Sequence, residues 1–123
     1  MIGYGKEVIL DLHHCDAKTM TRDSLKEYFI QLCKLIDMQR CDLHFWDDEG
    51  VLPEEVQTEP HTIGISAVQF ILTSNVTIHT LTEMKNCYVN IFSCKDFISK
   101  DAIEFTRDWF HGEVVQYKEV SRI

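Results

Sequence analysis

The chain has 123 residues, of which 45% are hydrophobic and 26% charged; this suits one compact domain over residues 1–123 and excludes a disordered chain. Its net charge of −8, without a basic stripe, excludes nucleic acid as a partner and only weakly favours a cationic small ligand. No apolar run approaches the roughly 20 residues that a membrane span needs, so we expect no membrane partner.

The cysteines and the start of the chain favour a cytoplasmic location. The five cysteines are odd in number and include no Cys-x-x-Cys pair, a pattern typical of reduced thiols rather than of a disulfide framework. Residues Met1–Lys6 lack a basic start and an apolar core, so we expect no signal peptide.

A strand, a helix and a second strand are predicted in the first part of the chain. Alternating apolar residues predict a strand over Glu7–Leu12, and Cys41–Trp46 predicts the next. Between them, Ser24–Asp37 is predicted to be an amphipathic helix, with Ser24 and Glu27 at capping-box spacing. Its apolar stripe consists of Leu25, Tyr28, Phe29, Leu32, Cys33 and Ile36.

A long acidic loop and a hairpin follow. The loop Asp47–His61 holds both prolines and six acidic residues, and loops of this length often act as lids or binding loops. Two β-rich runs, Gly64–Leu72 and Val76–Leu81, flank the polar cluster Thr73–Asn75. Such a pair of runs predicts a hairpin with its tip at the polar cluster.

The last part of the chain predicts a strand over Cys87–Phe92, a helix over Ser99–Phe110 that ends at Gly112, and a strand over Val114–Val120. Because hairpins dominate the order of elements, the fold class is α+β. We expect a two-layer α/β sandwich with a mostly antiparallel sheet and two helices on one face.

Four polar positions invite chemistry, and each also has an ordinary explanation. Ser74 is a polar residue of a hairpin tip, and a strand histidine such as His79 is commonly just hydrogen bonded. Cys94 ends a strand, where a cysteine usually acts as a small hydrophobe. Ser66 precedes Ser74 by eight residues, so a regular strand would place both on one face.

Two other chemistries find little support in the residues. His13, His14 and Cys15 are adjacent, but neighbours on a strand point to opposite faces and cannot all ligate one ion, so we expect no metal. A cysteine hydrolase that uses Cys94 and His79 is conceivable, although nothing marks an oxyanion hole. The sequence contains no glycine-rich phosphate-binding motif.

Three runs of residues around Ser74 form a recognisable pattern. They are Gly64-Ile65-Ser66-Ala67-Val68, Thr73-Ser74-Asn75-Val76-Thr77-Ile78-His79-Thr80 with Glu83, and Ile91-Phe92-Ser93-Cys94. The runs resemble the bacterial and archaeal S-adenosylmethionine decarboxylase family, which carries Gly-Val-Ser-Gly-Val, Glu-Ser-His-x-x-Ile-His-Thr-Trp-Pro-Glu and Phe-x-Cys-Gly. The start Gly5-Lys6-Glu7-Val8 resembles the family's Gly-x-His-Leu. The similarity covers nearly the whole chain outside the loop near residues 47–62.

The resemblance implies a proenzyme that matures by cutting itself between Thr73 and Ser74. Ser74 would become a pyruvoyl group, the prosthetic group that forms a Schiff base with the substrate amine. His79 would be the base of the elimination step, with Ser66 assisting by a hydrogen bond. Cys94 would return a proton to the substrate as general acid.

The resemblance also implies that Glu83 holds the ribose of S-adenosylmethionine, the substrate decarboxylated for spermidine synthesis. Several family positions differ here: Thr73 and Asn75 flank Ser74, Lys95 follows the cysteine, and Pro60 stands where the family has the aromatic that stacks on adenine. Phe45 or Trp46 could replace that aromatic if the long loop is an insertion.

Family members pair two chains with active sites at the interface, so the resemblance implies a homodimer of cleaved protomers. Two alternatives stay open. One is a sister pyruvoyl decarboxylase of arginine or ornithine, for which the acidic loop Asp47–Glu59 could supply a carboxylate. The other is an unprocessed, non-catalytic homologue that binds a ligand or a partner.

Overall fold

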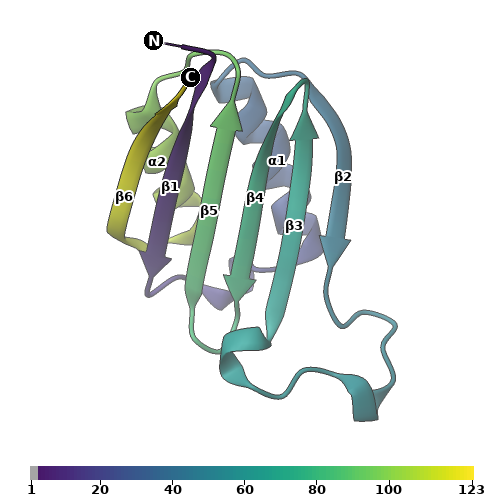
Figure 1. Cartoon of the computed structure of the whole chain (residues 1–123). Coiled ribbons are helices and arrows are strands. Elements are labelled where there is room, and N and C mark those ends of the chain that lie inside the picture. The colour runs from purple at the N-terminus through teal and green to yellow at the C-terminus, as the bar shows by residue number, and fades with distance from the viewer. Residues whose placement is uncertain (1–2) are drawn as a thin grey trace.

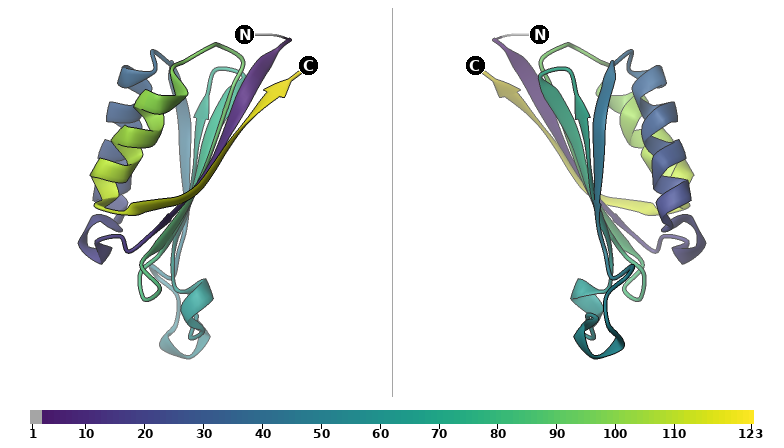
Figure 2. Two further views of the ribbon diagram at one scale, coloured as in Figure 1. Left: turned by 90° about the vertical axis from the view of Figure 1, so that its left-hand side faces the viewer. Right: turned by 90° about the vertical axis from the view of Figure 1, so that its right-hand side faces the viewer.

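The computed structural model describes residues 3–123, which form a six-stranded sheet with two helices on one of its faces (Figures 1 and 2). The strand order is β2-β3-β4-β5-β1-β6, and neighbouring strands run antiparallel. The predicted two-layer sandwich is therefore confirmed. Met1 and Ile2, where no signal peptide is expected, lie outside the described residues. The elements are β1 (Gly5–His13), α1 (Arg22–Leu35), β2 (Arg40–Trp46), β3 (Gly64–Ile71), β4 (Ser74–Leu81), β5 (Asn86–Ser93), α2 (Ser99–Phe110) and β6 (Glu113–Arg122).

The core lies between the sheet and the two helices. Strands β1, β4 and β5 bury every second side chain, so residues such as Val8, Ile78 and Ile91 point toward the helices. The Tyr28 hydroxyl of α1 shares a hydrogen bond of 2.7 Å with Thr106 Oγ1 of α2. This bond satisfies two buried polar groups and ties the helices together.

Helix α1 begins two residues earlier than predicted, and its cap differs. Thr21 is the N-cap residue, and its side chain accepts a hydrogen bond of 3.1 Å from the backbone N–H of Ser24. The predicted capping box of Ser24 and Glu27 is wrong, because Glu27 instead accepts a hydrogen bond from Gln31 on the exposed face. Thr21 offers the same hydroxyl chemistry three residues earlier.

Helix α2 has its predicted bounds, but its end has another cause. His111, with φ of 51°, adopts the left-handed conformation after the last turn, a role that the prediction gave to Gly112. Gly112 is required for close approach instead: a Cβ there would lie 2.8 Å from Cys15 Sγ. The glycine therefore lets the chain turn tightly against the end of β1.

The β3–β4 hairpin differs from its prediction at the tip. The turn consists of Leu72 and Thr73 alone, because Ile71 pairs directly with Ser74. Ser74 and Asn75 thus lie in strand β4 and not in the turn. The other predicted strands are all found, each slightly longer. The loop between β2 and β3 contains two short 3₁₀ turns, Pro53–Glu55 and Pro60–Thr62.

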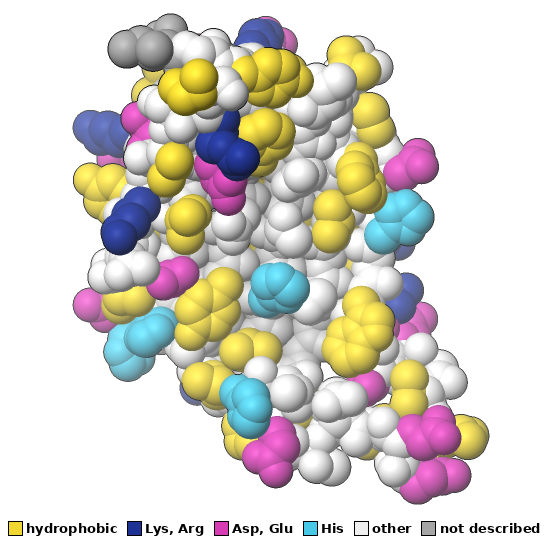
Figure 3. Space-filling view, in the orientation of Figure 1, with side chains coloured by type: hydrophobic (Ala, Val, Ile, Leu, Met, Phe, Trp, Pro, Cys, Tyr) yellow, Lys and Arg dark blue, Asp and Glu magenta, His cyan; other side chains and the backbone are white. Residues whose placement is uncertain are grey.

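The second face of the sheet carries no helix, as the side views show (Figure 2). Its surface mixes hydrophobic and polar side chains, and charged groups lie mostly toward its edges and on the long loop (Figure 3). We call it the open face; its central residues are Glu7, Ile9, Asn75, Thr77, His79, Tyr88, Asn90 and Phe92. Within residues 3–123, no helix has the length and apolar character to cross a membrane.

The cap of α1 can be tested by denaturation. Thr21→Ala removes the side chain that accepts from the Ser24 N–H, so it should lower the free energy of unfolding by about 1 kcal/mol. Glu27→Ala, the matched control from the predicted capping box, should change it by less than half as much. Urea unfolding followed by circular dichroism measures both, and a larger loss in Glu27→Ala would contradict this assignment.

Candidate active site

The residues singled out around Ser74 fall into two groups at opposite ends of the β3–β4 hairpin. Ser66 pairs with His79, whereas Ile71 pairs with Ser74 beside the turn. His79 lies five positions after Ser74 on β4, which corresponds to about 17 Å along an extended strand. The two groups therefore do not meet within one chain.

The two groups also lie on opposite faces of the sheet. Ser74 is 6% exposed and points to the helix side, together with Val76 and Ile78. His79 and its partner Ser66 point to the open face. The prediction that Ser66 and Ser74 share a face is wrong, because the two-residue turn between them breaks the regular alternation of the strand.

The Ser74 group is held by hydrogen bonds to the end of β5. The backbone N–H of Cys94 donates to Ser74 Oγ at 2.9 Å, and Cys94 Sγ lies 3.0 Å from Thr73 Oγ1. Thr73 has a φ of 54°, an unusual conformation for a β-branched residue. The peptide bond between Thr73 and Ser74 thus follows a strained residue and lies against a thiol.

This environment activates the thiol of Cys94. Hydrogen bonds from the Ser74 and Thr73 hydroxyls stabilise the thiolate and lower the pKa of Cys94 below its usual value. Burial has the opposite effect on two core cysteines, raising the pKa of Cys15 and of Cys33 to about 11. Cys94 is therefore suited to proton transfer, and these core cysteines are not.

The residue after Cys94 also departs from the family pattern, and the structure accounts for it. The Lys95 ammonium bonds the backbone carbonyl of Asp37 at 3.0 Å and its carboxylate at 2.5 Å. This bond and the ion pair lower the pKa of Asp37. Lys95 thus ties the loop that carries Cys94 to the end of α1.

The His79 group lines a cavity of about 430 Å³ at the other end of the hairpin. His79 Nδ1 and Ser66 Oγ share a hydrogen bond of 2.7 Å, and Trp46 pairs with Ser66 from the neighbouring strand. The long loop and β5 supply further walls that sequence reasoning missed. These are Gln57, His61, Thr62 and Tyr88.

The two aromatic residues that could stack on adenine, Phe45 and Trp46, point to opposite faces of the sheet. Trp46 is 56% exposed and lines the cavity beside Ser66 and His79. Phe45 faces the other side, where it packs against the core under the Arg22 guanidinium, 5.3 Å from its ring centre. Alternation along β2 explains the difference, and Phe45 is not part of the cavity.

Glu83 lies in the turn between β4 and β5, exposed to solvent. This turn is at the His79 end of the hairpin, so within one chain Glu83 lies at the other end of β4 from Ser74. Cys94 and His79 are likewise separated, so they form no hydrolase dyad within one chain. Among residues 3–123, no three His, Cys, Asp or Glu side chains gather as a metal site.

The acidic residues at the start of the long loop contact groups within the chain. Arg22 of α1 forms two hydrogen bonds of 2.7 Å with Asp47 and an ion pair of 2.8 Å with Glu49. Asp48 accepts a hydrogen bond from the backbone N–H of Gln57. These contacts fix the loop so that Gln57 and His61, and no described carboxylate, line the cavity.

Comparison with known proteins gives a consistent result. The sequence model of the family described as S-adenosylmethionine decarboxylase matches residues 6–123. A relative named S-adenosylmethionine decarboxylase proenzyme from Acidithiobacillus ferrooxidans (strain ATCC 53993 / BNL-5-31) is 24% identical over 126 residues, covering 99% of this chain and 84% of the relative. One from Oceanobacillus iheyensis is 24% identical over 121 residues, covering 96% and 86%.

The fold has a counterpart among solved structures. The crystal structure of the adenosylmethionine decarboxylase from Aquifex aeolicus VF5 superposes with a TM-score of 0.68 at 18% sequence identity. The match covers 95% of this chain and 87% of the other. At this identity the likeness establishes a shared fold.

The lowered pKa of Cys94 predicts its reactivity. Because the thiolate is the reactive form, Cys94 should be alkylated by iodoacetamide at lower pH than Cys15 or Cys33. Thr73→Val, which removes a hydroxyl from the thiol, should move the midpoint of the rate–pH profile upward. Peptide mass spectrometry of samples quenched over a pH series measures both, with Thr77→Val as the matched control. An unchanged midpoint in Thr73→Val would exclude the hydroxyl as a cause.

Proposed function

Since this chain belongs to the S-adenosylmethionine decarboxylase family, we propose that it is a proenzyme that cleaves itself between Thr73 and Ser74 and then decarboxylates S-adenosylmethionine for spermidine synthesis. Ser74 becomes the pyruvoyl group. The observation that carries this proposal is the strained turn that presents the Thr73–Ser74 bond to the Cys94 loop.

Maturation begins at the Ser74 hydroxyl. Its Oγ attacks the carbonyl carbon of Thr73, so an ester to Oγ replaces the peptide bond and the amine of Ser74 is freed. A base then removes the α-proton of Ser74, and the carboxylate of Thr73 leaves. The dehydroalanine that remains at position 74 hydrolyses to the pyruvoyl group with release of ammonia.

Local geometry favours the first of these steps. A β-branched residue in the left-handed region costs of order 1–3 kcal/mol, and cleavage after Thr73 releases this strain. The Cys94 N–H, by donating to Ser74 Oγ, fixes where that oxygen stands relative to the turn. The loss of the family's glutamate at position 73 is compatible with this chemistry, because that side chain is not the nucleophile.

The base must come from a second chain. His79, with Ser66 bonded to its Nδ1, is the best base on the open face, but it lies about 17 Å along the strand from Ser74. Two copies packed by their open faces, with a two-fold axis across the strands, would bring the Ser74 end of each chain over the His79 end of the other. We propose this homodimer of cleaved protomers, in which each active site takes residues from both chains.

The residues around each composite site then divide the catalytic work. The pyruvoyl group supplies a carbonyl that takes up the substrate amine and withdraws electrons as carbon dioxide leaves. Cys94, whose pKa is lowered, is positioned beside residue 74 to return a proton to the α-carbon. Such positioned proton transfer is typically worth about 10²–10⁴-fold in rate.

The cavity at the His79 end suits the nucleoside of the substrate. Its volume of about 430 Å³ falls in the usual range for small-ligand sites. Trp46 offers a large exposed ring for adenine, and Glu83 at the same end of the hairpin is available to the ribose hydroxyls. A site for arginine or ornithine would require a carboxylate instead, and the described lining of this cavity contains none.

Self-cleavage and the composite site can be tested together. The parental protein should give two fragments, 1–73 and 74–123, the second with a blocked amino end, on denaturing mass spectrometry. Ser74→Ala and His79→Ala should each abolish or strongly slow cleavage when expressed alone. Coexpressed, they should form heterodimers in which the His79→Ala chain, with its own Ser74 and its partner's His79, is cut.

The two chains differ in mass, so the fragments identify which one is cleaved. Val68→Ala, on the open face but outside both groups, serves as the control that should be cut normally. If the parental protein remains at full-length mass after long incubation, it is an unprocessed homologue. If it is cleaved but the mixed chains are not, the site lies within one chain.

The substrate is tested by release of carbon dioxide from S-adenosylmethionine, arginine and ornithine side by side. We expect S-adenosylmethionine to be preferred, and Trp46→Ala to raise its KM roughly tenfold or more through loss of stacking. Tyr117→Ala, an exposed aromatic on the edge strand β6, should leave KM unchanged. Preference for a basic amino acid, unaffected by Glu83→Gln, would overturn the nucleoside assignment.

A further inference from the structure

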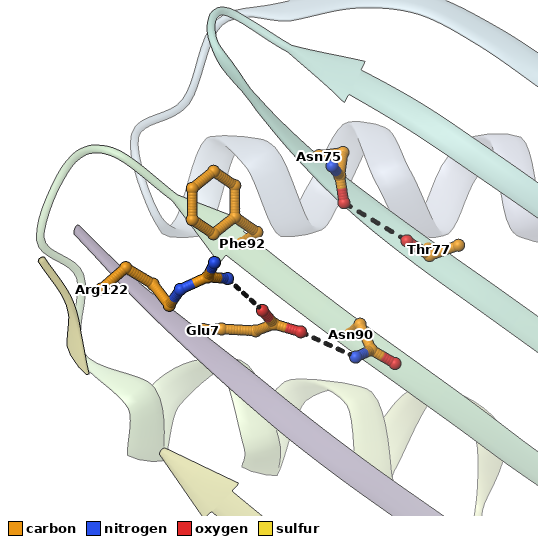
Figure 4. Close-up of a pocket in the computed structure, with 6 residues that line it drawn as sticks. All are labelled: Glu7, Asn75, Thr77, Asn90, Phe92 and Arg122. Atoms are coloured by element: carbon orange, nitrogen blue, oxygen red, sulfur yellow. Dashed lines mark hydrogen bonds and ion pairs between the residues drawn. The ribbon is translucent and has the colours of Figure 1, made fainter. Parts of the chain in front are cut away.

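A second, polar cavity opens on the open face at the Ser74 end of the sheet, with a volume of about 410 Å³. Figure 4 shows Glu7 between Arg122 and Asn90, with Asn75 and Thr77 on the neighbouring strand. Arg122 Nη1 lies 3.0 Å from Glu7 Oε1, and Asn90 Nδ2 donates to Glu7 Oε2 at 2.9 Å. Both carboxylate oxygens of Glu7 thus have partners, which fixes the arginine in place.

The register of the sheet brings Arg122 close to the maturation site. Arg122 pairs with Gly5, and a Cβ on Gly5 would lie 2.9 Å from the Cα of Cys94, so β1 approaches the end of β5 closely. The guanidinium reaches back across β1 to lie 5.3 Å from the Phe92 ring centre on β5. Phe92 pairs with Asn75 of β4, the residue next to Ser74, so the guanidinium lies on the open face beside the start of β4.

The chemistry of this cavity fits the amino-acid end of a substrate. A guanidinium has five N–H donors in a planar fork, and the ion pair with Glu7 engages Nη1, so the same group can also bind a carboxylate. The guanidinium carbon also lies over the Phe92 ring, 5.3 Å from its centre, within the range of a cation–π contact. The cavity also opens on the face where the proposed partner chain would bring its nucleoside cavity.

We propose that Arg122 binds the α-carboxylate of the amino-acid substrate and that Glu7 positions Arg122 for this task. The assignment rests on the proposed decarboxylase function and extends it. Binding of the carboxylate at Arg122 would aim the bond to be broken relative to residue 74. The nucleoside of the same substrate would lie in the Trp46 cavity of the partner subunit.

The test measures binding by isothermal titration calorimetry in the full-length Ser74→Ala background, in which no turnover occurs. The ligands are S-adenosylmethionine, L-arginine, L-ornithine and methylthioadenosine, which has the nucleoside but no amino-acid end. Arg122→Gln should weaken the binding of S-adenosylmethionine about ten- to hundredfold, the range expected for the loss of hydrogen bonds to a charged group. It should change methylthioadenosine binding by less than twofold.

Two further variants separate the role of Arg122 from a structural effect. Arg122→Lys keeps the charge but not the fork, so its loss of affinity should be intermediate. Lys118 lies on the same strand and face as Arg122 but pairs with Ile9, outside the cavity. Lys118→Gln should therefore bind S-adenosylmethionine with the same affinity as the protein that carries Ser74→Ala alone. Circular dichroism melting and sedimentation velocity check that each variant keeps its fold and oligomeric state.

The outcomes distinguish this proposal from the proposed function. If the parent binds arginine or ornithine but not S-adenosylmethionine, and Arg122→Gln loses that binding, the carboxylate site stands and the nucleoside assignment falls. The role of Arg122 would be overturned if Arg122→Gln lost equal affinity for S-adenosylmethionine and methylthioadenosine, or lost no affinity for any amino-acid ligand. Absence of any amino-acid binding by the parent would overturn it as well.

Discussion

The register of the β3–β4 hairpin is the constraint on which the rest of the site depends. Ile71 opposite Ser74 and Ser66 opposite His79 fix the distance between the two chemical groups and assign them to different faces. A shift of one residue would turn every side chain of β4 to the other face and bury His79 in the core. The two-residue turn that sets this register also places Thr73 in its strained conformation.

The two cavities at opposite ends of the hairpin both open on the face of the sheet that no helix covers. One side of the sheet has two helices to cover its aliphatic side chains, and the other has none (Figure 2). Both cavities relevant to chemistry, one at each end of the hairpin, open on that uncovered side. The two-fold pairing of open faces that we propose would place the polar cavity of one chain over the cavity with the exposed indole of the other, an arrangement that would suit a substrate with an amino-acid end and a nucleoside end.

The positions that depart from the family pattern are accommodated by local contacts. Lys95 bonds Asp37 and braces the Cys94 loop, and Thr73 supplies a hydroxyl to the thiol where the family has a glutamate. The long loop is anchored at its start by Arg22 and brings Gln57 to the cavity beside His79. These replacements alter the walls of the sites and leave the spacing of Ser66, Ser74, His79 and Cys94 unchanged.

The sequence by itself determined the two-layer fold, the bounds of α2 and the family, because helical and strand periodicity and motif spacing are local properties of the chain. It did not determine the faces of Ser66 and Ser74, the separation of Phe45 from Trp46, or the polar cavity around Glu7 and Arg122. The polar cluster Thr73–Asn75 suggests a three-residue turn, whereas the actual turn has two residues, and a change of one residue reverses which face of the sheet each side chain of β4 points to. Arg122 contacts Glu7 only because strands 115 residues apart in sequence pair in the sheet. Only the tertiary structure decides such contacts, although polar Asn90 within an apolar strand was one signal that the sequence offered.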